Sequence, residues 1–429
     1  MGTPKGVMGI LVGGGPAPGI NGVISAATIE ARNHNLEVIG FLNGYQHLMA
    51  GKTDSHEPLD IAKVSRIHYF GGSILGTSRA NPTKSPELLD NVIKSLKTLN
   101  VKYLLTIGGD DTAFSAMQIQ KRAGNDIHIA HVPKTIDNDL PLAANVPTFG
   151  FQTARHEGVH IVRNLMADSK TAAPRWYIVV AMGRKAGHLA LAIGKAAGAT
   201  LTVIPEEFGN RTVTFKEICD IVDGSILKRR SHQREHGVAI LAEGLVEHMT
   251  EEHREEIFGG DGMDRDEHGH IKLDDVELGR KVRDEMRRRY KARGLKTAFI
   301  NKNLGYELRC ADPIPFDCEY TRDLGYGAVK FLLQEKSAAV INFEDGVMKP
   351  LMFNEILDPK SGRPRTRLVD VQGESFEVAL KYMLRLNETD GANPASKEKL
   401  AAAANMSVSD FEKQFGYLME TQRVPPPKA

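Results

Sequence analysis

Short apolar segments alternate with longer amphipathic stretches along most of the chain. The apolar segments are rich in Val and Ile, and they cover residues 7–12, 37–41, 102–107, 127–132, 176–181, 200–204, 237–242 and 297–300. Each has the length of a strand, and the stretches between them have the length of helices, which is typical of βαβ units. The pattern predicts an α/β protein with doubly wound, mainly parallel sheets and helices on both faces.

Glycine-rich or polar runs follow most of these apolar segments. They read GGGPAPG after 7–12, GGDD after 102–107, PKTIDND after 127–132, MGRKAG after 176–181, PEE after 200–204 and EG after 237–242. In sheets of this kind, ligands bind at the carboxyl ends of the strands. We therefore expect these runs to border one crevice.

Beyond about residue 245 the alternation loosens. Residues 246–275 are polar and turn-rich, and residues 279–294 carry charges on most faces of a helix. Both stretches are predicted to be solvated. Residues 395–429 are helix-prone and end in prolines, which predicts an added helical segment followed by a frayed tail.

The composition is that of a globular protein with two or three domains: 429 residues, 41% hydrophobic and 25% charged. Lys and Arg number 55 against 54 Asp and Glu, so no overall field attracts nucleic acid or an anionic membrane. Three scattered cysteines argue against a disulfide framework. Since no apolar span reaches about 18 residues, we expect a cytoplasmic protein that binds a small ligand and neither nucleic acid nor membrane.

The first glycine run offers a site for an anion. A strand, a glycine loop and a helix follow one another in LVGGGPAPGIN, residues 11–21, so the helix can present free N–H groups to a phosphate. Pro18 breaks the dinucleotide pattern G-x-G-x-x-G, and Ile20 and Asn21 stand where a Walker loop has Lys and Ser or Thr. A phosphate loop and a tight βα turn without a ligand both remain open.

Two adjacent carboxylates end the run LTIGGDDTAFSA. The glycine pair lets the backbone approach a phosphate, and one of the two carboxylates, Asp110 or Asp111, can hold Mg²⁺ bound to phosphate oxygens. A second carboxylate at the same place ought to repel such a ligand. The sequence therefore raises the question of what would need both.

The run HVPKTIDNDLP is the most informative. Asp137 and Asp139 are two residues apart and, in an extended or turn conformation, project from the same side, just after Lys134 and Thr135. A carboxylate that accepts a hydroxyl proton beside a lysine that neutralises a transferring group suits phosphoryl transfer. The alternative is an Asx-turn that caps its own backbone.

Two further motifs carry arginines. Arg184 follows a strand in VVAMGRKAGHLALAIG, where its guanidinium suits a substrate phosphate, although a surface ion pair is the alternative. In GYELRCADP, Tyr306 and Arg309 share one face if the segment is helical, and packing plus one solvated charge is the alternative there.

Together, the order and spacing of the motifs resemble the phosphofructokinase family over about residues 5–345. The matching elements are GGGPAPGIN (13–21), NGY (43–45), GTSR (76–79), GGDDT (108–112), PKTIDND (133–139), MGR (182–184), AEG (242–244) and YELR (306–309). The resemblance implies two doubly wound domains that face each other across a cleft. It also implies Mg²⁺-dependent, reversible transfer of phosphate to the 1-hydroxyl of fructose 6-phosphate, a step of glycolysis and gluconeogenesis.

The same resemblance implies a division of the chain. Residues 1–150, completed by about 308–345, would bind the phosphate donor and Mg²⁺. Residues 151–307 would bind the sugar phosphate, and residues 346–429 would form a C-terminal helical extension and tail.

By matching positions, the resemblance gives each motif residue a role. Asp137 would be the general base and Asp110 the Mg²⁺ ligand, while Gly15 and Arg79 would face the donor phosphates. The residues that would bind fructose 6-phosphate are Thr135, Ile136, Asp137, Asp139, Met182, Gly183, Arg184, Glu243, Tyr306 and Arg309. Arg175 matches an arginine contributed by a neighbouring subunit, which implies a homodimer or homotetramer.

Asp111 and Lys134 point to the donor. In the family, ATP-using members carry glycine where this chain has Asp111, which leaves room for the α-phosphate of the nucleotide, and commonly glycine where it has Lys134. A carboxylate there blocks and repels that phosphate but does not exclude pyrophosphate. Lys134 adds a cation able to stabilise charge during transfer. The resemblance therefore implies pyrophosphate as the donor, with Asp111 and Lys134 in the donor site.

Other readings stay open beside this one. An ATP-dependent 6-phosphofructokinase is compatible with Lys134 but not readily with Asp111. A non-catalytic regulatory subunit that binds sugar phosphate is opposed by the intact Asp110, Asp137 and Arg184. A dinucleotide-binding oxidoreductase is disfavoured by the broken glycine pattern.

Overall fold

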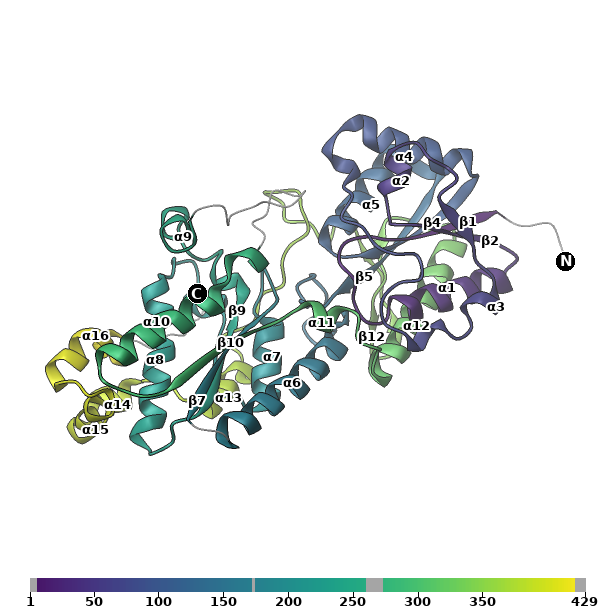
Figure 1. Ribbon diagram of the computed structural model, residues 1–429. Coiled ribbons are helices and arrows are strands. Elements are labelled where there is room, and N and C mark those ends of the chain that lie inside the picture. Colours follow the sequence, from purple (N-terminus) through teal and green to yellow (C-terminus); the bar gives the residue numbers. More distant parts are fainter. Residues whose placement is uncertain (1–5, 172–173, 260–272, 421–429) are drawn as a thin grey trace. The chain divides into compact units, whose positions relative to one another are not determined.

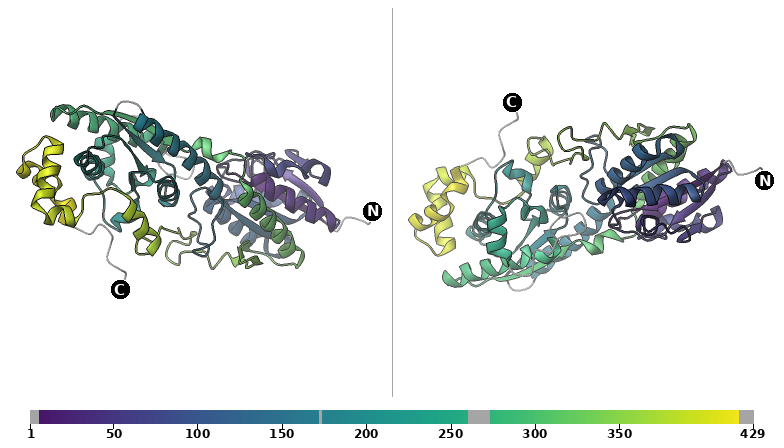
Figure 2. Two further views of the ribbon diagram at one scale, coloured as in Figure 1. Left: turned by 90° about the horizontal axis from the view of Figure 1, so that it is seen from below. Right: turned by 90° about the horizontal axis from the view of Figure 1, so that it is seen from above.

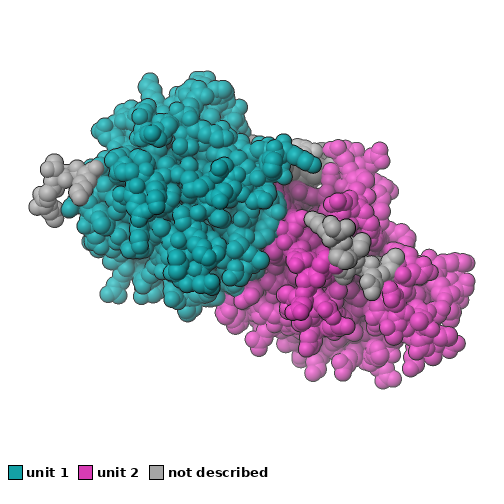
Figure 3. All heavy atoms as spheres, turned by 180° about the vertical axis from the view of Figure 1, so that it is seen from behind, with its two compact units in different colours: residues 1–154, 306–367 teal, residues 155–305, 368–429 magenta. Residues whose placement is uncertain are grey.

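A computed structural model describes residues 6–171, 174–259 and 273–420 of the chain (Figure 1). The chain forms two compact units: residues 1–154 with 306–367 make unit 1, and residues 155–305 with 368–429 make unit 2 (Figure 3). The region that the sequence predicts as a C-terminal extension from residue 346 is thus divided, and its residues 346–367 belong to unit 1. In the part of the chain that is described, no helix has the length and apolarity needed to cross a bilayer.

Unit 1 contains one eight-stranded sheet in the order β14-β11-β5-β4-β1-β2-β3, with β6 paired to β5. Its parallel strands are β1 (Val7–Val12), β2 (Glu37–Phe41), β4 (Val101–Gly108), β5 (His128–Thr135), β6 (Phe149–Gly150) and β11 (Ala339–Val340). The antiparallel edge strands are β3 (His56–Pro58) and β14 (Leu351–Met352), and β12 (Phe343–Glu344) pairs with β13 (Val347–Met348) in a separate ribbon. The four apolar segments predicted here all form strands. Pieces of two or three residues escaped prediction because they are too short to show a period.

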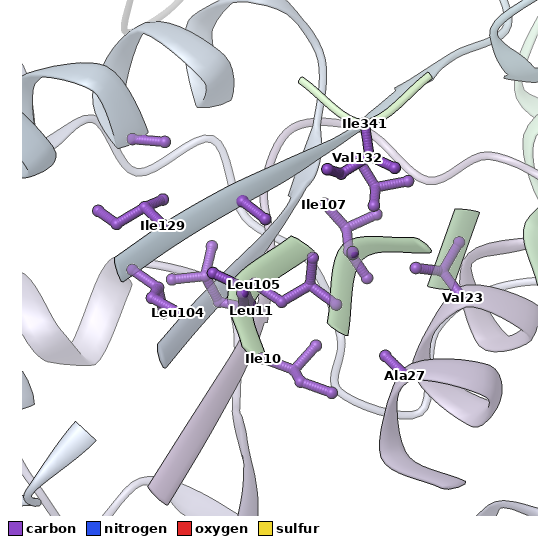
Figure 4. Close-up of a cluster of buried hydrophobic side chains, with 14 of the residues drawn as sticks. Ile10, Leu11, Val23, Ala27, Leu104, Leu105, Ile107, Ile129, Val132 and Ile341 are labelled. Atoms are coloured by element: carbon purple, nitrogen blue, oxygen red, sulfur yellow. The ribbon is translucent and has the colours of Figure 1, made fainter. Parts of the chain in front are cut away.

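The core of unit 1 is built from the apolar segments that predicted the strands. Figure 4 shows Ile10 of β1, Leu104 of β4 and Ile129 of β5 in one cluster with Val23 of α1, and each of these side chains is fully buried. Figure 1 shows α1 and α12 on one face of the sheet and α4 and α5 on the other. The helices of this unit are α1 (Ile20–Asn33), α2 (Gln46–Met49), α3 (Ile61–Val64), α4 (Pro86–Thr98), α5 (Asp110–Ala123), α11 (Tyr306–Arg309) and α12 (Pro315–Leu333).

Unit 2 contains a parallel four-stranded sheet in the order β10-β7-β9-β8. Its strands are β7 (Arg175–Ala181), β8 (Leu201–Val203), β9 (Gly237–Ala242) and β10 (Ala298–Leu304). The helices packed with this sheet are α7 (His188–Ala197), α8 (Phe215–Ser231) and α10 (Leu278–Ala292), and α6 (Phe151–Thr171) begins in unit 1 and continues into unit 2. The prediction of doubly wound, mainly parallel sheets is confirmed.

One prediction in unit 2 is wrong. The arginine-rich stretch 279–294 is not a solvated helix, because Val282, Met286 and Tyr290 of α10 are buried at a spacing of four residues. Arg289 on the same helix is also buried, and its guanidinium lies 2.7 Å from Asp220 and 3.2 Å from Asp223 of α8. Because charged residues dominate this stretch, its narrow apolar stripe is hard to recognise in the sequence. Within the predicted solvated region 246–275, α9 (Glu251–Phe258) forms, and residues 260–272 lie outside the described residues.

Four helices end the described chain: α13 (Glu374–Tyr382), α14 (Glu388–Ala392), α15 (Pro394–Ala404) and α16 (Val408–Glu420). The helices α15 and α16 pack on α8, and Figure 2 shows α14, α15 and α16 as one yellow group. Phe411 and Phe415 of α16 are fully buried in the core of unit 2. The helix-prone end of the sequence is therefore an integral layer of this unit.

Candidate active site

The glycine loop after β1 lies against Lys134. The Lys134 ammonium donates a hydrogen bond to the carbonyl oxygen of Gly15. Gly14 has a φ of 80°, and a Cβ added there would lie 3.3 Å from Lys134 Nζ. The loop therefore needs glycine at position 14 both for its left-handed backbone and for the approach of the lysine.

The two glycines before Asp110 have different environments. A Cβ added at Gly108 would lie 2.3 Å from Thr112 Oγ1, so this glycine makes space for a neighbouring side chain and not for a phosphate. A Cβ added at Gly109 would meet only the Lys134 carbonyl oxygen, at 3.6 Å. Only Gly109 therefore leaves open space that a phosphate could approach, and the interpretation that both glycines serve this purpose does not hold for Gly108.

Asp110 and Asp111 are the first two residues of α5. Gly109 is the N-cap, without a side-chain capping bond, and Asp110 Oδ1 accepts a hydrogen bond of 2.9 Å from the Asp111 N–H. Asp111 is therefore not the residue that caps this helix. Both carboxylates are stabilised by the partial positive charge of the helix N-terminus.

The turn after β5 follows a buried lysine. Lys134 is only 4% exposed, and Asp137 follows it at the end of the strand, where its N–H donates to Thr135 Oγ1 over 3.0 Å. The next residue, Asn138, has a φ of 57°, which is a left-handed conformation. We call residues Thr135–Asp139 the catalytic turn, because they include the predicted general base.

The electrostatic surroundings of Lys134 bring the predicted residues together. The pKa of Lys134 is lowered to about 8, mainly by burial and also by the positive charges of Arg309 and Arg79, while Asp137 and Asp110 oppose the shift. These four neighbours come from separate segments of unit 1. The sequence motifs GTSR, GGDD, PKTIDND and YELR therefore converge on a single ammonium group.

Arg309 and Tyr306 lie on one face of α11, as their spacing predicts. The Arg309 guanidinium stacks 4.8 Å from the centre of the Tyr306 ring. A Cβ added at Gly15 would lie 3.5 Å from Arg309 Cζ, so this guanidinium also borders the glycine loop. Tyr306 is 63% exposed. Arg309 therefore lies beside the glycine loop that binds Lys134, with Tyr306 stacked on its guanidinium.

Asp111 has a partner that sequence reasoning missed. Its Oδ1 lies 3.7 Å from the guanidinium of Arg363, which also lies 5.1 Å from the ring centre of Phe114. Arg363 follows Asp111 by more than half the chain, so no local pattern connects them. The only available signal was the arginine-rich run RPRTR, residues 363–367.

In unit 2, the carboxylate of Glu243, which follows β9, binds the turn that follows β7. Gly183 has a φ of 138°, and its N–H donates to Glu243 Oε1 over 2.9 Å. Met182 N–H donates to the Leu304 carbonyl at the end of β10. The structure therefore brings Met182, Gly183 and Glu243 together. Arg184 follows them, with its guanidinium 3.5 Å from Glu247.

Arg175 lies elsewhere in the same unit. It begins β7, whereas Met182 follows the end of that strand, so the two residues stand at opposite ends. The Arg175 guanidinium lies 3.0 Å from Asp168 of α6. Within one chain, Arg175 is thus separate from the Met182 turn, and its contribution to a neighbouring subunit stays a prediction.

The predicted site residues fall into two sets by unit. Those of unit 1 are Gly15, Arg79, Asp110, Asp111, Lys134, Thr135, Ile136, Asp137, Asp139, Tyr306 and Arg309. Those of unit 2 are Arg175, Met182, Gly183, Arg184 and Glu243. Among residues 6–171, 174–259 and 273–420, no group of three or more His, Cys, Asp and Glu could hold a metal ion. Mg²⁺ at Asp110 fits this setting, because Mg²⁺ commonly takes one or two carboxylates together with water and substrate phosphates.

Comparison with known proteins agrees with the motifs. The Phosphofructokinase family model matches residues 7–332. Pyrophosphate--fructose 6-phosphate 1-phosphotransferase of Naegleria fowleri is 55% identical over 427 residues, covering 97% of this chain and 97% of that protein. The protein of the same name from Thermotoga maritima is 52% identical over 416 residues, covering 96% and 99%. An ATP-dependent 6-phosphofructokinase of Bacillus pumilus is 30% identical over 355 residues, covering 82% and 94%.

Solved structures share the fold. The pyrophosphate-dependent phosphofructokinase from Marinobacter aquaeolei matches with a TM-score of 0.64 and 18% identity, covering 89% of this chain and 92% of that one. Phosphofructokinase from Pichia pastoris matches with a TM-score of 0.63 and 20% identity, covering 97% and 39%.

Proposed function

The chain belongs to the phosphofructokinase family, and we propose that it transfers a phosphoryl group from pyrophosphate to the 1-hydroxyl of fructose 6-phosphate. The products are fructose 1,6-bisphosphate and phosphate, and the reaction is reversible and uses Mg²⁺. The observation that carries this proposal is the convergence of Asp137, Asp110, Arg79 and Arg309 on the buried Lys134. Near full-length identity above 50% to two proteins named for this reaction supports it.

Asp137 is the general base of the proposed reaction. Its carboxylate accepts the proton of the sugar hydroxyl while the hydroxyl oxygen attacks the phosphorus atom. General bases of this kind typically contribute about 10²–10⁴ in rate. The hydrogen bond from the Asp137 N–H to Thr135 Oγ1 supports this role, because it fixes the backbone of the turn.

Lys134, Arg79 and the Gly15 loop bind the donor. A pyrophosphate anion near Lys134 favours the ammonium form, so the lysine is charged when its ligand is present. In a buried site, that charge acts strongly on a transferring phosphoryl group. Asp110 holds Mg²⁺, which supplies neutralisation of phosphate charge when bound.

Asp111 selects pyrophosphate over ATP. Its carboxylate sits at the second position of α5, beside Asp110, and it repels an α-phosphate that a nucleotide would place there. Asp111 was predicted to exclude a ligand, and its ion pair with Arg363 orients the carboxylate without removing its bulk. An ATP-dependent enzyme is the alternative that this residue opposes.

Unit 2 provides the sugar-phosphate site. Arg184 binds the 6-phosphate, and Glu243 sets the Met182–Gly183 turn through the Gly183 N–H. The Thr135, Ile136, Asp139, Tyr306 and Arg309 residues of unit 1 bind the sugar as well. Arg175 reaches the site of a neighbouring subunit in a homodimer or homotetramer. We place this enzyme in the cytoplasm.

The test is product formation from fructose 6-phosphate and Mg²⁺ with pyrophosphate or ATP as the donor. Fructose 1,6-bisphosphate is measured by an aldolase-coupled assay, and phosphate by ³¹P NMR. We expect turnover with pyrophosphate and little with ATP. Turnover with ATP alone would identify an ATP-dependent enzyme, and sugar-phosphate binding without turnover on either donor would identify a regulatory subunit.

A further inference from the structure

A segment beyond the matched family region returns to the catalytic turn. Residues 353–367, which we call the C-terminal hairpin, follow β14 and lie outside residues 7–332. Leu357 and Pro364 pair across the hairpin, and the Asp358 N–H donates to the Arg363 carbonyl over 2.8 Å. Phe353 anchors one end because it is 3% exposed in the core of unit 1. The other end is Arg367.

Arg367 binds the loop that follows β5. Its Nε donates to the Asn138 carbonyl over 3.0 Å, and one terminal nitrogen donates to the carbonyls of Ala143 at 2.9 Å and Val146 at 2.7 Å. The same nitrogen lies 3.5 Å from the Leu142 carbonyl. The planar guanidinium thereby collects backbone oxygens from several points of one loop, which a point charge such as a lysine cannot do.

Besides the bond to the Asn138 carbonyl, two further contacts of Arg367 reach the catalytic turn. The second terminal nitrogen of Arg367 donates to Asn138 Oδ1, and the Arg367 N–H donates to the Asp139 carbonyl over 2.7 Å. Asn138 lies between the two aspartates of the turn and has the left-handed φ of 57°. Its Oδ1 also accepts from the Thr148 N–H over 3.0 Å. Arg367 therefore binds Asn138, the left-handed residue that directly follows Asp137.

The loop has little other regular support. No helix or strand occurs between Thr135, which ends β5, and Phe149, which begins β6, although all of these residues are described. A loop without strand pairing satisfies its backbone carbonyls through local turns, side chains or water. The Arg367 side chain satisfies several of them from 221 to 229 residues away in sequence.

We propose that Arg367 is a positioning residue, which holds the catalytic turn from outside the family domain so that the Asp137 carboxylate meets the sugar hydroxyl. This role rests on the proposed function of Asp137. It also gives the C-terminal hairpin a function, because this segment places the Arg367 guanidinium against the catalytic turn.

The matched variants are Arg367→Met, Arg367→Lys and, as a control in the same hairpin, Arg365→Met. The Arg365 guanidinium binds the Glu355 carbonyl over 2.6 Å within the hairpin, and no described contact of its side chain involves the catalytic turn. In the full-length enzyme, we expect Arg367→Met to lower kcat about 100-fold, since a small misplacement of a reacting group can cost that much. KM for both substrates should change only a few-fold, and Arg365→Met should behave like wild type.

Two further measurements separate positioning from general destabilisation. If Arg367→Met does not fold, Arg367→Lys should fold and lose about 10-fold in kcat, because one ammonium cannot span the carbonyls. In Arg367→Ala, added methylguanidinium should restore activity in a saturable manner, whereas Asp137→Asn should not respond. An unchanged kcat in Arg367→Lys and Arg367→Met, or a loss confined to KM, would overturn the proposal.

Hydrogen exchange tests the contact without using activity. In Arg367→Met, amides of residues 136–148 should exchange faster than in wild type and in Arg365→Met, because the loop loses its main side-chain support. Equal exchange in all three proteins would contradict the role of Arg367. If wild type itself failed to transfer phosphate, the proposed function would fail while the exchange comparison would still decide whether Arg367 holds the turn.

Discussion

Lys134, the cation of the proposed donor site in unit 1, and Arg184, the cation of the proposed sugar site in unit 2, are held in different ways. Lys134 is 4% exposed, and its pKa is lowered to about 8 by burial. The Arg184 side chain is 20% exposed and forms an ion pair with Glu247. A lysine in this setting can lose its charge near neutral pH, whereas an arginine cannot.

The difference follows from what each phosphate does. The donor phosphates undergo bond changes, so a buried cation beside them stabilises charge where it develops, at the cost of its own desolvation. In the proposed reaction the 6-phosphate of the sugar only anchors the substrate, for which a partly buried planar guanidinium is sufficient. Unit 1 is therefore expected to control kcat and unit 2 to control KM.

The largest effect should come from Asp137→Asn in unit 1. Removal of the general base should lower kcat about 10²–10⁴-fold, with the thermal midpoint unchanged, because the amide keeps the shape of the side chain. Steady-state kinetics with pyrophosphate and a thermal melt measure the two quantities. Turnover close to wild type would remove Asp137 from the chemistry and with it the assignment of kcat to unit 1.

Arg184→Met in unit 2 should act mainly on KM, whereas Asp137→Asn acts on kcat. Loss of a charge-assisted hydrogen bond to the 6-phosphate, worth about 1.5–3 kcal/mol, should raise KM for fructose 6-phosphate roughly 10-fold to 100-fold. KM for pyrophosphate should stay near wild type, which serves as the internal control. A fall in kcat with KM unchanged would show that the two units do not divide the work in this way.

Asp111→Gly should change kcat/KM by a smaller factor, and in opposite directions for ATP and for pyrophosphate. Removing the carboxylate takes away the obstacle to an α-phosphate, so kcat/KM for ATP should rise while kcat/KM for pyrophosphate falls. Lys134 remains, so we expect a weak dual-donor enzyme and a non-additive further shift when Lys134→Gly is added. If ATP use stayed undetectable and pyrophosphate use intact, donor choice would lie outside α5.

Much of this arrangement was visible in the sequence because its causes are local. Val- and Ile-rich runs predict the long strands, and the residue pairs Asp110–Asp111 and Asp137–Asp139 lie at strand ends, where chemistry is expected. The prediction for α10 was wrong because it rested on the number of charged residues and overlooked the apolar stripe of Val282, Met286 and Tyr290.

The parts that could not be predicted depend on contacts between distant segments. Arg367 reaches Asn138 across 229 residues, and no local period records such a pairing. Burial is likewise a property of the folded chain: the run PKTIDND predicts a role for Lys134 but not its burial, which the sheet and the glycine loop bring about. The positions of the candidate site residues near strand ends could thus be predicted, whereas their burial and their contacts with distant segments could not.

The smallest effect, and the most direct probe of the buried cation, is the pH dependence of donor capture. We expect the ammonium form of Lys134 to be the active one, so kcat/KM for pyrophosphate should be constant below the pKa of about 8 and fall as pH rises through it. At saturating pyrophosphate the bound anion keeps the lysine charged, so kcat/KM for fructose 6-phosphate should show no decline at that pH. Lys134→Arg should lose the alkaline decline if it retains activity, because a guanidinium stays charged throughout. The ionisation of pyrophosphate itself is common to both proteins, so the difference between their profiles isolates the lysine. The same decline in wild type and Lys134→Arg would mean that the donor site does not depend on the charge of Lys134, and the contrast between the two cations would then be one of position only.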